Sequence, residues 1–150
     1  MVRFNANLSS SSLESLIKQL NTHGKKLVEA QRDVLQALAD YVYDRIMFYV
    51  PVDTGRLKSS FEKEVSNEIA KVYTDLFYAK YVEFGTGIRG KSENNQEGKY
   101  DTKYTDIKSL TYNESYQGQP ARKFIYKAVQ DLEQNYVEIA KNVLRKKGLI

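Results

Sequence analysis

The segment that decides the fold reads Pro51-Val52-Asp53-Thr54-Gly55-Arg56-Leu57-Lys58-Ser59-Ser60-Phe61. A long helical pattern precedes it and an alternating, strand-like pattern follows it. Proline cannot continue a helix, because it lacks the amide donor and its ring clashes with the preceding turn. Asp53 and Thr54 offer side-chain acceptors for the free amides of a helix start, and Gly55 can adopt backbone angles closed to other residues. We therefore expect a corner between a helix and a sheet.

The same corner contains Asp53-Thr54-Gly55, the catalytic tripeptide of aspartic proteases, which pair two carboxylates that share a proton. Only one copy is present, so such an enzyme would have to be a homodimer. Arg56 follows the glycine where the protease loop has a small residue, and its guanidinium would hold the aspartate ionised. No segment supplies the two apolar residues and glycine that the protease fold needs beneath this loop. A turn with a helix cap is the favoured interpretation, and a homodimeric aspartic protease is the least favoured alternative.

The composition predicts one globular domain over residues 1–150 and lowers the odds of an enzyme. Hydrophobic residues make up 41% of the chain and charged residues 28%, which suits a domain that buries a real core. No apolar run approaches the about 20 residues that cross a membrane, and the N-terminus lacks the apolar core of a secretion signal. The chain has no cysteine and one histidine, His23, which excludes disulfides and thiolate or histidine-rich metal sites. We expect no catalytic, cofactor-binding or metal-binding residues.

Charge and aromatic content favour an interaction protein. The net charge of +4 is modest for a dedicated nucleic-acid binder. Tyrosine, with 12 copies, is the aromatic residue most used in protein–protein contacts, because it is large, stiff and polar at one tip. The alternative is a single-stranded nucleic-acid-binding module, which would use three lysines interleaved with tyrosines. Acidic residues dilute that basic patch. The lysines are Lys99, Lys103 and Lys108.

The hydrophobic periodicity predicts two long amphipathic helices. The first runs from Lys25 to Val50, and the second from Arg122 to Lys147, with Gly148 as its cap. The first apolar face consists of Val28, Leu35, Leu38, Val42, Ile46 and Tyr49. The second consists of Ile125, Val129, Leu132, Tyr136, Ile139 and Val143. A short capped helix is also expected within residues 1–24.

Between the long helices the pattern indicates a small sheet. Polar and apolar residues alternate in Ser59–Val65 and again in Ile69–Tyr73, with turn residues between them, which is typical of a β-hairpin. Tyr78–Phe84 reads as a helical turn or an irregular bend. Residues 88–118 are polar and rich in turn formers, so they form either an inserted arm or a mobile surface loop. Within this arm the strands Lys99–Tyr104 and Ile107–Tyr112 would close a protruding hairpin.

These predictions combine into an α+β fold, a small antiparallel sheet packed against two long helices. Three separated segments, Pro51–Leu57, Tyr78–Gly87 and Pro120–Phe124, together resemble the signature of the HK97 gp10-like family. This family comprises small tail-completion and head–tail joining proteins of long-tailed bacteriophages. The order of the segments and the flanking helices match over roughly residues 25–147. The sequence departs from the pattern at Lys123, where the family has a second proline, and in the long arm.

The resemblance implies a structural subunit of the virion, made in the host bacterial cytoplasm. It would assemble into a ring, commonly hexameric, at the head-proximal end of the tail tube. Its partners would be further copies of itself, the tail tube protein and the head-side connector, with DNA passing through only as cargo. Neither a membrane nor a cofactor is implied. The resemblance leaves open whether such a ring terminates the tube, joins it to the head, or does both.

On this interpretation the motif residues are scaffold. Arg56 would pair with Glu83, and Tyr78, Tyr81 and Phe84 would pack the corner onto the helices. The arm would reach a neighbouring subunit or the tube, adding a strand to an exposed sheet edge. The motif residues are Asp53, Thr54, Gly55, Arg56, Tyr78, Glu83, Phe84, Gly85, Thr86, Arg122 and Phe124. The candidate arm contacts are Lys99, Tyr100, Lys103, Tyr104, Tyr112 and Tyr116.

Overall fold

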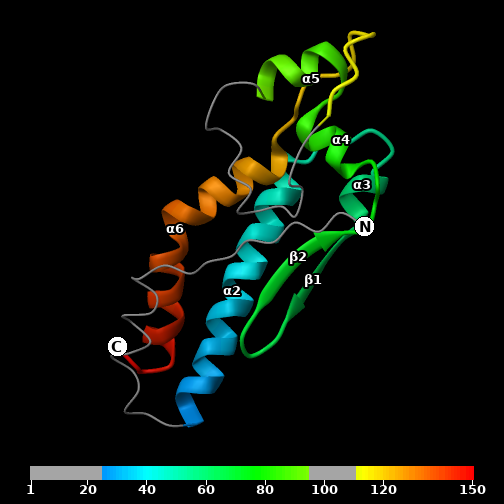
Figure 1. The fold of residues 1–150 in the computed structure, drawn as a ribbon. Helices are drawn as coiled ribbons and strands as arrows, with labels where there is room; N and C mark the ends of the chain where they lie inside the picture. Colours follow the sequence, from blue (N-terminus) through cyan, green and yellow to red (C-terminus); the bar gives the residue numbers. More distant parts are fainter. Residues whose placement is uncertain (1–24, 95–110) are drawn as a thin grey trace.

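The two predicted long helices form the body of the molecule. The structure is a computed structural model that describes residues 25–94 and 111–150. In it α2 (Lys25–Tyr49) and α6 (Phe124–Lys146) lie side by side along much of their length (Figure 1). Both helices end within a few residues of their predicted bounds. The short helix expected in residues 1–24 and the strand Lys99–Tyr104 lie outside the described residues.

The buried faces of the long helices differ in detail from the predicted ones. In α2, Val28 is 51% exposed and Leu35 is half-buried, whereas alanine and valine residues nearby are fully buried. In α6 two alanines likewise take the inner positions. The contact therefore combines these small residues with the predicted large apolar residues Leu38, Ile46 and Leu132, which are fully buried. The residues of α2 and α6 that form the buried core are Ala30, Val34, Leu38, Ala39, Val42, Ile46, Phe124, Ile125, Ala128, Leu132, Ala140 and Leu144.

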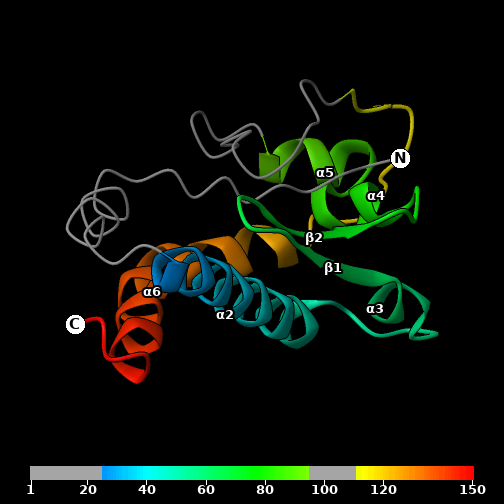
Figure 2. The same cartoon turned by 90° about the horizontal axis from the view of Figure 1, so that it is seen from below.

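The predicted β-hairpin is confirmed. Strands β1 (Phe61–Val65) and β2 (Ala70–Thr74) pair antiparallel and form a two-stranded sheet in the described part of the chain. Phe61, Val72 and Thr74 are buried, while Lys63 reaches the neighbouring helix, where its Nζ donates to Asp40 Oδ1 at 2.6 Å. The hairpin therefore packs on α2 and leaves its charged positions in solvent (Figure 2).

Three short helices gather at the end of the molecule where α2 ends (Figure 1). They are α3 (Arg56–Ser59), α4 (Ala79–Phe84) and α5 (Gly87–Asn94). For the second of these, the sequence predicted a helical turn or an irregular bend, and the structure has the helical alternative, a helix of six residues. The prediction of a polar loop from Ile88 onward is wrong at its start, because residues 88–94 belong to α5.

The segment that returns from the arm is tied to α5 and to the turn before it. The amides of Thr86, Ile88 and Arg89 donate to the carbonyls of Gln119, Tyr116 and Gln117 at 2.9, 3.2 and 3.0 Å. The backbones approach so closely that a Cβ on Gly118 would lie 1.9 Å from the Thr86 carbonyl oxygen. Residues 111 and 112 are not strand. The rest of the expected hairpin arm lies outside the described residues and stays a prediction.

The fold class is α+β, with a two-stranded antiparallel sheet and one long helix packed against another. Among the helices of residues 25–94 and 111–150, none combines the length and apolar character needed to span a membrane.

Candidate functional site

The corner after α2 is a turn that leads into α3. Gly55 has φ 78°, in the left-handed region that glycine adopts at little cost, and stands just before the helix. The Arg56 amide donates to Thr54 Oγ1 at 3.4 Å, a long contact, and the Ser59 amide donates to the Gly55 carbonyl at 2.9 Å. No atom lies within 4 Å of a Cβ built on Gly55, so the backbone angle, not space, calls for glycine.

Glu83 in α4 is fully buried and caps the start of α6. Its Oε2 accepts from the Ile125 amide at 2.9 Å and its Oε1 accepts from the Tyr126 amide at 3.0 Å. A carboxylate is favoured there because the first amides of a helix are unpaired and carry partial positive charge. The predicted pairing of Arg56 with Glu83 is therefore wrong: the carboxylate is used by α6, and Arg56 is exposed.

Lys123 explains why α6 takes its cap from α4. This residue stands at the N-cap position with φ 51° and makes no capping side-chain bond. Its amide donates to the Glu83 carbonyl at 3.0 Å, and the Arg122 amide donates to the Val82 carbonyl at 3.0 Å. Proline has neither an amide hydrogen nor access to this φ. Two backbone hydrogen bonds therefore join the segment just before α6 to α4.

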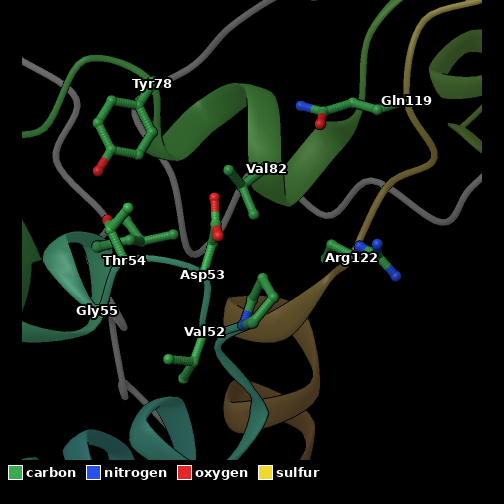
Figure 3. A pocket seen from close by; sticks show the side chains of 10 residues that line it. Val52, Asp53, Thr54, Gly55, Tyr78, Val82, Gln119 and Arg122 are labelled. Atoms are coloured by element: carbon green, nitrogen blue, oxygen red, sulfur yellow. The ribbon is translucent and has the colours of Figure 1, made fainter.

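The three motif segments meet around one hollow of about 480 Å³, here called the motif hollow (Figure 3). The loop 51–55 and Leu57 form one side of it. Tyr78 and Val82 come from the start and the middle of the α4 region, and Gln119 and Arg122 come from the segment that leads into α6. Gln119 is fixed there, because its Nε2 donates to the Tyr81 carbonyl and its amide donates to Thr86 Oγ1.

The motif hollow has a mixed lining of apolar and polar groups, with one charged side chain of each sign. Leu57 is buried, Val82 is half-buried, and Val52 is 63% exposed on the rim. Asp53 and Arg122 are exposed, and among the described residues neither side chain forms an ion pair. Such a hollow can bind an apolar side chain flanked by charges, and the free carboxylate and guanidinium can select its orientation.

The geometry around Asp53 differs from that of a protease loop. The aspartate follows a helix and precedes a helical turn, whereas the protease loop follows an apolar strand. Across residues 25–94 and 111–150, no cluster of three or more histidine, cysteine or acidic side chains is placed to hold a metal ion.

The remaining motif residues divide between core and surface. Phe84 and Phe124 are buried, and the Phe124 ring meets the Phe61 ring edge-on at 6.0 Å between centroids. Tyr78 is half-buried against the core. Tyr81, expected to pack the corner onto the helices, is instead 42% exposed.

The predicted arm contacts are placed only in part. The Tyr112 hydroxyl donates to the Phe84 carbonyl at 3.1 Å, so this residue is used within the subunit. Tyr116 is 49% exposed. The other four, Lys99, Tyr100, Lys103 and Tyr104, lie outside the described residues.

Sequence reasoning missed Val82 and Gln119 as hollow residues and the capping role of Glu83. Val82 carries no local signal, because an apolar residue in a short helical turn reads as core. Gln119 and Glu83 act through bonds to segments 33 to 43 residues away in the chain, which no local pattern records.

The chain was compared with known proteins, and one family model matches a region that contains motif segments. No curated protein and no solved structure matches the chain. The family model named HK97-gp10_like, described as "Bacteriophage HK97-gp10, putative tail-component", matches residues 14–85, just under half of the chain. This match includes the first motif segment and most of the second. The resemblance is thereby confirmed over residues 14–85, which are similar to the model of the HK97-gp10-like family.

Proposed function

We propose that this protein is a tail-completion subunit of a long-tailed bacteriophage. In this proposal several copies, six by family analogy, form a ring at the head-proximal end of the tail tube. The ring contacts the tube protein on one side and the head-side connector on the other, and DNA passes through it. The protein would then reside in the virion at the head–tail junction.

The observation that carries this proposal is the convergence of the three motif segments on one hollow. These segments are far apart in the sequence and together form a concave surface with apolar and charged side chains. Such a surface is typical of a binding site. The match to a phage tail family makes a structural protein of the virion the natural partner for such a site.

The distribution of exposed apolar residues supports an assembly role. The most exposed large apolar side chains in the described residues are Phe48 at 72%, Phe77 at 70% and Val52 at 63%. All three belong to the last turn of α2, the loop after it, or the turn before α4. Burial of these side chains against another subunit would remove their apolar surface from water. A contact between two different surfaces closes into a ring when the rotation between copies fits.

Electron microscopy of particles from a phage in which this gene is deleted tests the proposal. Tail-less heads beside overlong tubes indicate that the protein ends tube growth. Tails of normal length that are not attached to heads indicate that it joins tail to head. Supplying the wild-type gene in trans is the matched control and restores normal virions. Normal, infectious particles from the deletion strain would contradict the proposal.

A further inference from the structure

We propose that the motif hollow receives the Phe48 side chain of a second copy of this chain. The inference rests on the proposed function, in which copies assemble side by side, and it names the contact between them. Phe48 acts as a knob and the motif hollow as its socket.

Phe48 is an exposed aromatic residue with two ring contacts inside its own helix. Its ring, 72% exposed, meets the Tyr49 ring edge-on at 5.1 Å between centroids, and the Arg45 guanidinium lies 5.0 Å from its centroid. Arg45 is itself fixed, because its Nε donates to Asp131 Oδ2 at 2.5 Å and its Nη2 donates to the Tyr49 hydroxyl at 2.8 Å. A side chain that is already held in place loses little conformational freedom when a partner binds it.

The motif hollow has the size and walls to take this ring. Its volume is about 480 Å³, whereas roughly 150 Å³ is enough to hold benzene in an apolar cavity. Leu57, Val82 and Tyr78 supply apolar surface, and the remaining space admits the groups that flank the phenyl ring. Burial of the ring would remove from water the most exposed large apolar side chain of the described chain.

The charges around knob and socket are complementary. Asp44, one helical turn before Phe48, is exposed, and Lys127 has its Nζ 5.9 Å from the Tyr49 ring centroid. Within the described residues neither has an ion-pair partner in its own subunit, and the same holds for Asp53 and Arg122 of the hollow. Two copies can pair Asp44 with Arg122 and Lys127 with Asp53, which fixes the orientation of the contact.

Phe77 is equally exposed but belongs to the socket side. It precedes Tyr78, which lines the hollow, and the two rings meet edge-on at 5.6 Å. Phe77 therefore extends the apolar rim on which the neighbour's helix end would rest. Knob and socket consist of different residues, and a subunit whose knob enters one neighbour while its socket receives the knob of another is linked to two copies, as a ring requires.

Cross-linking tests the contact directly, because the chain has no cysteine of its own. One preparation carries Asp44→Cys and another carries Arg122→Cys, and the two are mixed with a short thiol-to-thiol reagent. A reagent is preferable to oxidation, since an Asp–Arg pair keeps the Cα atoms further apart than a disulfide permits. We expect linked dimers in the mixture, and at least tenfold fewer when the Asp44→Cys chain also carries Phe48→Ala. The matched control replaces Asp44→Cys by Val28→Cys, which lies at the other end of α2 and should give no dimers.

A charge exchange provides the second measurement. Asp44→Arg and Arg122→Glu should each weaken self-association at least tenfold in sedimentation experiments, and the double variant should recover most of the loss. Both residues are exposed, so the fold should be unchanged by circular dichroism.

Three results would overturn the inference. The test mixture could give no dimers, the control mixture could give as many dimers as the test mixture, or the double variant could self-associate no more strongly than the single variants. A tail defect in the deletion phage without these cross-links would leave the proposed function standing and refute only the contact. Cross-links together with normal virions from the deletion phage would support the contact and refute the proposed function.

Discussion

The pair of long helices and the end that carries the motif hollow differ in what holds them together. Between α2 and α6 the contact is a stripe of buried apolar side chains, with ion pairs such as Arg45–Asp131 only at its margin. At the hollow end, backbone-to-backbone hydrogen bonds and the buried carboxylate of Glu83 join α4 to the segment before α6. Apolar packing adjusts to changes of shape, whereas close backbone contacts do not. The hollow end should therefore be the less tolerant of substitution.

The largest expected effect is at Gly118. A Cβ there would lie 1.9 Å from the Thr86 carbonyl oxygen, and φ is 67°. We expect Gly118→Ala to lower the free energy of unfolding by about 4 kcal/mol, since overpacking adds to backbone strain. Urea denaturation measures this loss. The control is Gly55→Ala, which has a similar φ of 78° but open space around the new methyl group, and should cost about 1 kcal/mol. Equal losses for both variants would show that the close approach of the backbones carries no penalty.

Glu83→Gln comes next, with an expected loss of about 2 kcal/mol, because the amide nitrogen of glutamine would face a backbone N–H and leave it unpaired. Thermal unfolding at neutral pH provides the measurement. The control is Glu133→Gln, at an exposed position within α6, the helix that Glu83 caps. It should change stability by less than about 0.5 kcal/mol. If Glu83→Gln behaves like this control, the capping role assigned to Glu83 is refuted.

A substitution in the helix pair that keeps the side-chain volume should do less harm. Leu132 is fully buried between the long helices, and Leu132→Met keeps its volume, so we expect a loss below about 1.5 kcal/mol. Leu132→Ala, which leaves a cavity, should cost about 3 kcal/mol and serves as the reference in the same denaturation series. A methionine variant as unstable as the alanine variant would mean that this contact is as intolerant as the hollow end.

The smallest effect is a pH dependence in the hairpin. A hydrogen bond to Asp40 raises the pKa of Lys63, and a hydrogen bond to Glu62 raises the pKa of Tyr73. Because both groups hold their protons more tightly when folded, their contribution is present below their ordinary pKa values and is lost as the pH rises through the raised ones. Stability should thus fall above about pH 10. Denaturation at pH 9 and pH 11 should show a smaller fall for the double variant Tyr73→Phe, Lys63→Arg than for the wild type, and an equal fall would contradict this assignment.

The periodic parts of the fold could be predicted from the sequence, because their signal is local. The spacing of apolar residues gave the bounds of α2 and α6 to within two or three residues, and alternation gave the hairpin. The predicted face of α2 is confirmed at Leu38, Val42 and Ile46, which are buried, and is wrong at Val28, which is exposed while Ala30 is buried. A prediction from hydrophobic periodicity gives most weight to large apolar residues, whereas small residues such as alanine can also lie at a helix–helix contact. Helix α5 was missed because its glycines favour a loop locally, and contact with the returning chain stabilises it.

The candidate site could be predicted only as separate segments. The resemblance brought Pro51–Leu57, Tyr78–Gly87 and Pro120–Phe124 together as a set, and nothing in their own sequences states that they share a hollow. The pairing of Arg56 with Glu83 was a hypothesis drawn from the resemblance, and it is wrong because Glu83 is buried and caps α6 while Arg56 is exposed. Residues whose partners lie far away in the chain are the ones that local reasoning cannot place.

The cap that α4 provides for α6 also has a consequence for the order in which the chain matures. Amides near position 125 find their acceptor some 42 residues upstream, and α2 finds its apolar partner only after α6 has been synthesised. Contacts at such separations form late, because closing a long loop costs conformational entropy before the contacts can stabilise the chain. A nascent chain on the ribosome therefore lacks the α2–α6 contact and a formed socket until α6 has been synthesised, which would delay any recruitment into a growing particle until that point.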